Sequence, residues 1–214
     1  MIKEIYIFFS LLLGTILLFL FSTASAMPTL TEKVLKGYEL AQDWDLNSAE
    51  KLSNSLIKDH PKSGDAHFLN ARIEFLKGNY ERSWRVLERV GDSYEEVMEF
   101  KKRVNATRKA TKNFVTRETA HFRIRYEEGP DEVLLVYAEE VLEKSYQVLG
   151  KILDHYPQEK VLIEFYPDRQ PFSKISPLTL QDILTSGTVA LCKYNRIMMI
   201  SPGSLVRGFN WMDT

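Results

Sequence analysis

The apolar pattern of this chain changes its period once, near Ala120, and this change limits the possible folds more than any other feature. Residues 31–104 carry apolar side chains at helical spacing, whereas residues 121–126 alternate between apolar and polar side chains. A helix and a strand bury one face through different periods, so the two regions cannot share one kind of element. The sequence therefore predicts an α+β chain in which a helical block precedes a strand-containing region.

The helical block is similar to itself at an interval of 34 residues. Small residues fall at equivalent positions, where paired helices can approach closely. The aligned pairs are Gly37 with Ala71, Ala41 with Phe75, Ala49 with Ser83, and Leu56 with Val90. The block resembles tetratricopeptide repeats, and a plain helical hairpin bundle is the alternative. Two such repeats seldom stand alone, so we expect residues 31–104 to pack against the rest of the chain.

The region after Ala120 predicts strands around one long helix. Residues 131–153 form an amphipathic pattern. Its expected buried stripe contains Leu134, Ala138, Val141, Ser145, Val148, Leu149 and Ile152. The other expected elements are strands at 121–126, 161–166, 188–192 and 196–201, with a loop of short helical turns at 171–185. The basic junction at residues 105–119 is expected to be a solvated helix end and linker.

Composition excludes some classes of function. The chain of 214 residues is 44% apolar and 27% charged, which is typical of a globular protein. Its formal net charge of −1 gives no strong attraction to nucleic acid, so we predict no nucleic-acid partner. A single cysteine excludes an intramolecular disulfide framework.

The N-terminus has the pattern of a targeting segment. Lys3 precedes a nearly continuous apolar run from Ile5 to Phe21, and Ala24-Ser25-Ala26 supplies the small residues of a signal-peptidase site. We predict that residues 1–26 are a signal peptide and that the protein is exported to the periplasm or the extracellular space. An uncleaved membrane anchor is the alternative, and only this segment is expected to contact the membrane.

Residue types that carry chemistry are sparse. The histidines are His60, His67, His121 and His155. They form no His-x-x-x-His pair, so we predict structural roles for them. Cys192 lies in an apolar strand and is expected to be a small buried side chain. Asp43, Asp45 and Asn47 alternate as calcium ligands do, but no glycine or terminal glutamate completes such a loop. The sequence predicts no catalytic, cofactor-binding or metal-binding residue in this chain.

The last third of the chain resembles a family of enzymes. Two apolar strands with a tight turn span Gly187 to Pro202, and Arg207, Trp211 and Asp213 follow. This run is similar to the approach to the active-site helix of secreted bacterial zinc metallopeptidases of the peptidase MA (gluzincin) type. The resemblance covers about residues 120–214. It implies the strand–helix–strand–hairpin half of a zincin-like domain, behind a tetratricopeptide-like block at residues 31–104.

The same resemblance implies a function. Residues 188–192 would be an edge strand, and the backbone of Val189, Ala190 and Leu191 would pair with a peptide substrate. The family's His-Glu-x-x-His helix would follow Thr214, so zinc is expected in a longer parent and not in this chain. We expect an inactive fragment of an exported zinc metallopeptidase with a peptide or protein substrate.

The alternative hypothesis is an exported tetratricopeptide-type binding or scaffold protein, with a protein partner at the repeat block. In the peptidase interpretation, one face of the hairpin would lack the active-site helix that covers it. We therefore expect Val189, Leu191, Met198 and Ile200 to be partly uncovered.

Export can be tested directly. Expressed with its leader in a bacterial host, the protein should yield a mature N-terminus at Met27, because Ala24-Ser25-Ala26 is the cleavage pattern. N-terminal sequencing of the secreted material measures this. An intact Met1 in the membrane fraction would instead support the anchor.

Overall fold

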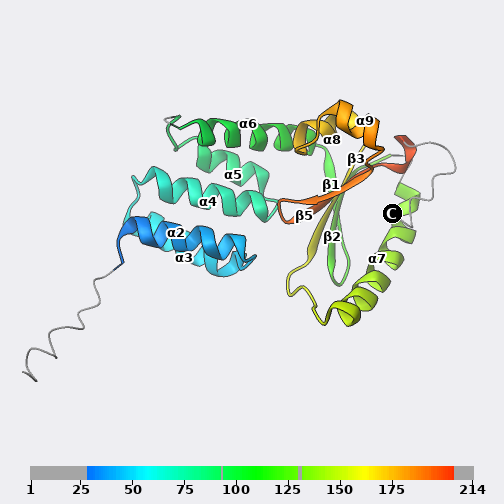
Figure 1. The fold of residues 1–214 in the computed structure, drawn as a ribbon, viewed down its shortest axis with the longest axis horizontal. Coiled ribbons are helices and arrows are strands. Elements are labelled where there is room, and N and C mark those ends of the chain that lie inside the picture. Colours follow the sequence, from blue (N-terminus) through cyan, green and yellow to red (C-terminus); the bar gives the residue numbers. More distant parts are fainter. Residues whose placement is uncertain (1–27, 93, 130–131, 205–214) are drawn as a thin grey trace, which may run out of the picture.

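A computed structural model describes residues 28–92, 94–129 and 132–204 of the chain. The proposed leader and the residues Arg207, Trp211 and Asp213 lie outside these ranges. The described chain is an α+β protein in which helices come first and a mixed sheet follows (Figure 1). None of its helices has the length and apolar character needed to span a membrane.

Helices α2 to α6 form the helical block. Side-chain caps begin the first two: Thr29 forms a capping box with Glu32, and Asp45 accepts a hydrogen bond from the backbone N–H of Ser48 at 3.1 Å. The helices are α2 (Leu30–Gln42), α3 (Leu46–Asp59), α4 (Gly64–Leu76), α5 (Tyr80–Leu87) and α6 (Glu95–Ala110). Consecutive helices α2 to α4 pack together, as do α4, α5 and α6. The block is thus two helical hairpins with a fifth helix beside them.

The residues aligned at an interval of 34 are the ones that this block buries. Ala49 and Ser83, at equivalent positions, are both completely buried. The Ser83 hydroxyl donates to the carbonyl oxygen of Ala71 at 2.7 Å, across the α4–α5 hairpin. Gly37 lies against Leu69 of α4, where an added Cβ would come within 2.4 Å of a methyl group. Small residues therefore stand where neighbouring helices approach most closely.

Five strands form one mixed sheet in the order β1-β2-β3-β5-β4. They are β1 (Phe114–Glu118), β2 (Phe122–Glu127), β3 (Val161–Tyr166), β4 (Ala190–Lys193) and β5 (Arg196–Ile200). Strands β2, β3 and β5 are parallel, and each outer strand, β1 or β4, runs antiparallel to its neighbour. The connecting elements are α7 (Glu132–Leu153) between β2 and β3, then α8 (Arg169–Ile175) and α9 (Leu180–Ser186) between β3 and β4, with η1 (Pro202–Ser204) after β5.

Helices lie on both faces of the sheet, with α7 on one side and α6, α8 and α9 on the other (Figure 1). The α7 face contains Phe122, Ile124, Ile163 and Phe165. The opposite face contains Tyr166, Met198 and Ile200, which pack with Phe172, Ile175 and Ile183. This two-sided burial explains why β3 is apolar at nearly every position rather than alternating.

The predicted buried stripe of α7 is wrong at four of its seven residues, while Ala138 is buried and Ser145 is half-buried. The side chains that pack on the sheet belong to Leu135, Leu142 and Tyr146. Exposed members of the predicted stripe are Val141, Val148, Leu149 and Ile152. The side chain of Leu134 lies outside the described part. The positions that face the sheet are Leu135, Ala138, Leu142 and Tyr146, so most of the buried stripe is shifted by one residue from the predicted one.

The basic junction at residues 105–119 is more ordered than a linker. Helix α6 continues to Ala110, and residues 114–118 form β1, which pairs along its whole length with β2. Phe114 and Val115 both pack into the cores of the sheet region. The helical block and the sheet are therefore joined by a short turn.

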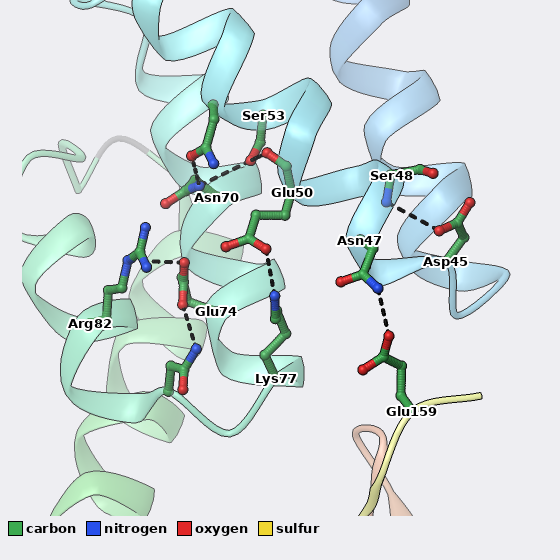
Figure 2. Close-up of polar contacts among 12 residues, drawn as sticks. Asp45, Asn47, Ser48, Glu50, Ser53, Asn70, Glu74, Lys77, Arg82 and Glu159 are labelled. Atoms are coloured by element: carbon green, nitrogen blue, oxygen red, sulfur yellow. Dashed lines mark hydrogen bonds and ion pairs between the residues drawn. The ribbon is translucent and has the colours of Figure 1, made fainter. Parts of the chain in front are cut away.

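Polar contacts tie the helices to each other and to the sheet region (Figure 2). Glu74 of α4 is completely buried and forms an ion pair with Arg82 of α5 at 3.0 Å. Lys77 reaches Glu50 of α3 at 2.5 Å. The Asn47 side chain donates to Glu159, in the loop before β3, at 2.6 Å. The last contact connects residues 112 positions apart, so it links the surface of the helical block to the sheet region.

Gly78 provides a test of this close packing. It lies between α4 and α5 at a φ of +79°, and an added Cβ would lie 2.7 Å from a methyl carbon of buried Leu162 in β3. Gly78→Ala should lower the free energy of unfolding by about 2–4 kcal/mol, through backbone strain and overpacking. Gly187→Ala is the control, because its φ is +70° with nothing within 4 Å. Gly187→Ala should lower the free energy of unfolding by only about 1 kcal/mol. Equal losses in urea melts would show that the two regions are not packed closely at Gly78.

Candidate functional site: the free edge of the sheet

Strand β4 forms one outer edge of the sheet, because within the described residues it pairs only with β5. It contains Ala190 and Leu191, two of the three residues predicted to pair with a peptide, and Val189 immediately precedes it. The register places Ala190 opposite Met199 and Lys193 opposite Arg196. An unpaired edge of this kind presents backbone donors and acceptors to a second chain.

The register determines which backbone groups are free. In an antiparallel pair, residues bond across the ladder and point away from it alternately. The N–H of Ile200 donates to the carbonyl oxygen of Val189 at 2.8 Å, so Val189 and Leu191 face β5. The N–H and C=O groups of Ala190 and Cys192 consequently face the open edge. Of the three predicted residues, only Ala190 presents free groups, and Cys192 joins it.

The sheet face beside this edge is half covered on the α7 side. Ile197 and Met199 are part-buried in the core beneath α7, and Cys192, opposite Ile197, is exposed. The expectation that Cys192 is buried is therefore wrong. The cause is its place on an edge strand, beyond the reach of α7.

The opposite face of the hairpin differs from expectation. Met198 and Ile200 are completely buried, although we expected both to be partly uncovered. Val189 and Leu191 are part-buried. Helices α8 and α9, predicted only as helical turns in a loop, cover this face through Phe172, Ile175 and Ile183. The face of the hairpin that stays partly open is the one on the α7 side, which carries Cys192, Ile197 and Met199.

The tip of the hairpin contacts the helical block. Tyr194 and Asn195 make a two-residue turn with φ values of 56° and 57°, a conformation suited to the right-handed twist of a hairpin. The Asn195 amide donates to the carbonyl oxygen of Leu76, at the end of α4, at 3.3 Å. The Tyr194 ring meets Phe75 edge to face, with centroids 5.8 Å apart. The edge strand is thus held at its tip by residues far away in the sequence.

A completely buried carboxylate, Glu164 of β3, supports the same hairpin from beneath. It accepts hydrogen bonds from the hydroxyls of Tyr80 in α5 at 2.7 Å and Tyr166 at 2.6 Å. Arg196 of β5 lies 3.0 Å away and Arg125 of β2 lies 3.3 Å away. Burial, and then the nearby Glu164 charge, raise the pKa of Tyr80 and of Tyr166 well above the usual value. Both phenols therefore stay protonated and donate to Glu164.

Arg196 is the largest completely buried side chain in the described part of the protein. Its guanidinium lies over the rings of Phe75 at 4.9 Å, Tyr80 at 5.0 Å and Tyr194 at 5.7 Å. Its two terminal nitrogens have no hydrogen-bond partner among the described residues. Aromatic faces replace some of the lost hydration of this cation. The first residue of β5 is thereby locked against α4 and α5.

The histidines occupy separate places. His67 is buried, with Nε2 2.9 Å from the carbonyl oxygen of Pro61, and His60 and His155 are exposed. His121 lies 2.6 Å from Glu143 of α7 and stacks on Tyr146. Desolvation opposes ionisation of Glu143, but hydrogen bonds from His121 and Thr119 outweigh it and lower the pKa of Glu143 to about 2.

The zinc that the resemblance implies would have its ligands after Thr214, so the described residues were not expected to hold it. Within residues 28–92, 94–129 and 132–204, no three side chains of His, Cys, Asp or Glu come together in a way that could hold a metal ion. Asp45 caps α3 and Asn47 contacts Glu159, so the alternating acidic segment serves structural contacts.

Comparison with models of known families, with curated protein sequences and with solved structures finds no match for this chain. Inferences about function therefore depend on the geometry of the chain itself.

The buried carboxylate gives the next prediction. Glu164→Leu should lower the free energy of unfolding by about 3–5 kcal/mol, because it leaves two arginines and two phenols without their shared acceptor. Glu118→Leu is the control, since Glu118 also contacts two cations but lies in solvent. Glu118→Leu should lower the free energy of unfolding much less, because water screens the two ion pairs of Glu118. Urea melts of both variants measure this, and similar losses would contradict a special role for Glu164.

Proposed function

We propose that this chain is the exported, peptide-binding half of a zinc metallopeptidase of the gluzincin kind. In this role β4 receives an extended polypeptide as an added strand. The observation that carries the proposal is the free antiparallel edge at β4, beside a sheet face that α7 leaves half covered. Its first element is a tetratricopeptide-like block, supported by the burial of equivalent residues such as Ala49 and Ser83.

Strand addition explains what the edge can do without a catalytic residue. The backbone groups of Ala190 and Cys192 can hold a peptide through ladder hydrogen bonds, which select an extended shape and not a sequence. Alternate peptide side chains would then lie beside Ala190 and Cys192, on the sheet face where Ile197 and Met199 are part-buried. Zinc would supply the hydrolytic chemistry only in a longer parent protein. We assign no metal ligand and no catalytic residue to this chain.

An exported tetratricopeptide-type binding protein is the second candidate function. A cavity of about 220 Å³ between α4, α6 and the hairpin tip favours it, because a partner could insert a side chain there. The two candidates place the bound polypeptide on different elements, so variants of β4 separate them.

Cys192→Pro tests the edge. Proline removes the N–H that faces outward and leaves the ladder between β4 and β5 unchanged, because the bonds to β5 come from Leu191 and Lys193. Binding of a fluorescein-labelled Thr-Val-Lys-Val-Thr peptide, measured by anisotropy, should weaken about tenfold. Methylation of the peptide's own backbone nitrogens should weaken binding in the same way.

Cys192→Ser is the matched control, because it keeps the N–H and approximates the size of cysteine. It should bind the peptide as the unmodified protein does. Equal affinities for the proline and serine variants would contradict strand addition at β4. Peptide binding that persists in Cys192→Pro would favour the helical block as the binding element.

A further inference from the structure

The hairpin tip and the helical block enclose a second candidate site. The cavity of about 220 Å³ lies between α4, α6 and the turn at Tyr194. Phe75, Leu76 and Phe100 form its apolar wall, Tyr194 lines one side, and charged side chains of α4 and α6 line the rest. A volume of this size accommodates one large apolar side chain. The cavity is thus composite, since it needs both the helices and the sheet.

Cations gather around the ring that closes the cavity. Arg103 of α6 lies 4.9 Å from the centroid of Tyr194, and Lys193 lies 5.7 Å from it. The buried Arg196 lies 5.7 Å from the same centroid. Three positive charges therefore converge on one tyrosine at the junction.

Two acidic residues, Glu96 and Glu99, line the cavity together with Arg72 and Arg103, and both already have ion-pair partners. Glu96 binds Arg72 at 2.6 Å, and Glu99 binds Lys102 at 2.6 Å. Among the described residues, no carboxylate lies within ion-pair distance of Arg103 or Lys193. The buried Arg196 is paired with Glu164 and does not line the cavity, so it offers no free charge to a ligand. The exposed cations without an ion pair in the described chain are Arg103, which lines the cavity, and Lys193, which lies beside the Tyr194 ring.

We propose that this junction cavity binds an acidic segment of a polypeptide, with a large apolar side chain in the cavity and an adjacent carboxylate at Arg103 and Lys193. The apolar wall selects the side chain, and the two exposed cations select the charge. A phosphate group alone would satisfy the cations but would leave the apolar wall unfilled. This inference names a ligand for the cavity that favours the second candidate function, and it does not need strand addition, because it uses the side chains of Arg103 and Lys193 and not the outward backbone groups of Ala190 and Cys192.

The probe is a fluorescein-labelled Ser-Gly-Asp-Phe-Gly-Ser peptide, with its affinity for the whole chain measured by anisotropy. Replacing the aspartate of the peptide by asparagine, or its phenylalanine by alanine, should each weaken binding about fivefold to tenfold. Arg103→Gln should produce a similar loss for the aspartate peptide and little further loss for the asparagine peptide. Thermal melts check that the variant remains folded.

Arg89→Gln is the control, because it removes the same charge from an exposed position that lines no part of the cavity. It should leave the affinity unchanged. Cys192→Pro should also leave it unchanged, and a loss there would move the binding to the strand edge. An unchanged affinity in Arg103→Gln, or displacement of the peptide by inorganic phosphate alone, would overturn the proposal.

Discussion

The carboxylate of Glu164 is the constraint on which the junction of this protein depends. It is completely buried in β3, and it takes hydrogen bonds or ion pairs from α5, β2 and β5. A buried charge of this kind is tolerated only when its partners are correctly placed, because desolvation is costly. The helical block must therefore dock in one position, with Tyr80 above the sheet and Arg196 beneath the aromatic rings.

That docking determines how the edge strand is presented. Arg196 begins β5, and the turn at Tyr194 and Asn195 rests on the end of α4 (Figure 1). The β4–β5 hairpin is thus fixed at its tip while the outer side of β4 stays open. An open edge is a liability for aggregation, and the short length of β4 and the charge of Lys193 limit it. The same features suit reversible addition of an extended peptide.

The sequence predicted the positions of the helices and strands better than it predicted which faces of them are buried. The strand at residues 161–166 and the hairpin turn were predicted correctly, because apolar runs and turn residues are local signals. Strand β1 was missed because basic residues mask the short Phe114-Val115-Thr116 signal. The packing of α7 and the burial of Met198 depend on which helix covers which face, and no local pattern specifies this. Glu164 is the one charged residue in the apolar strand β3, and this pattern indicates a buried carboxylate that needs a partner. Its partners Tyr80 and Arg196 come from elements distant in the sequence.

Hydrogen exchange at single amides of β4 tests the central claim most directly. In the free protein, the amides of Leu191 and Lys193 should be protected, because they bond to β5, whereas those of Ala190 and Cys192 should exchange fast. Addition of an extended peptide should slow exchange at Ala190 and Cys192 and leave the other two unchanged. Uniform protection along β4 in the free protein, or no change when the peptide is added, would contradict a free edge that receives a strand.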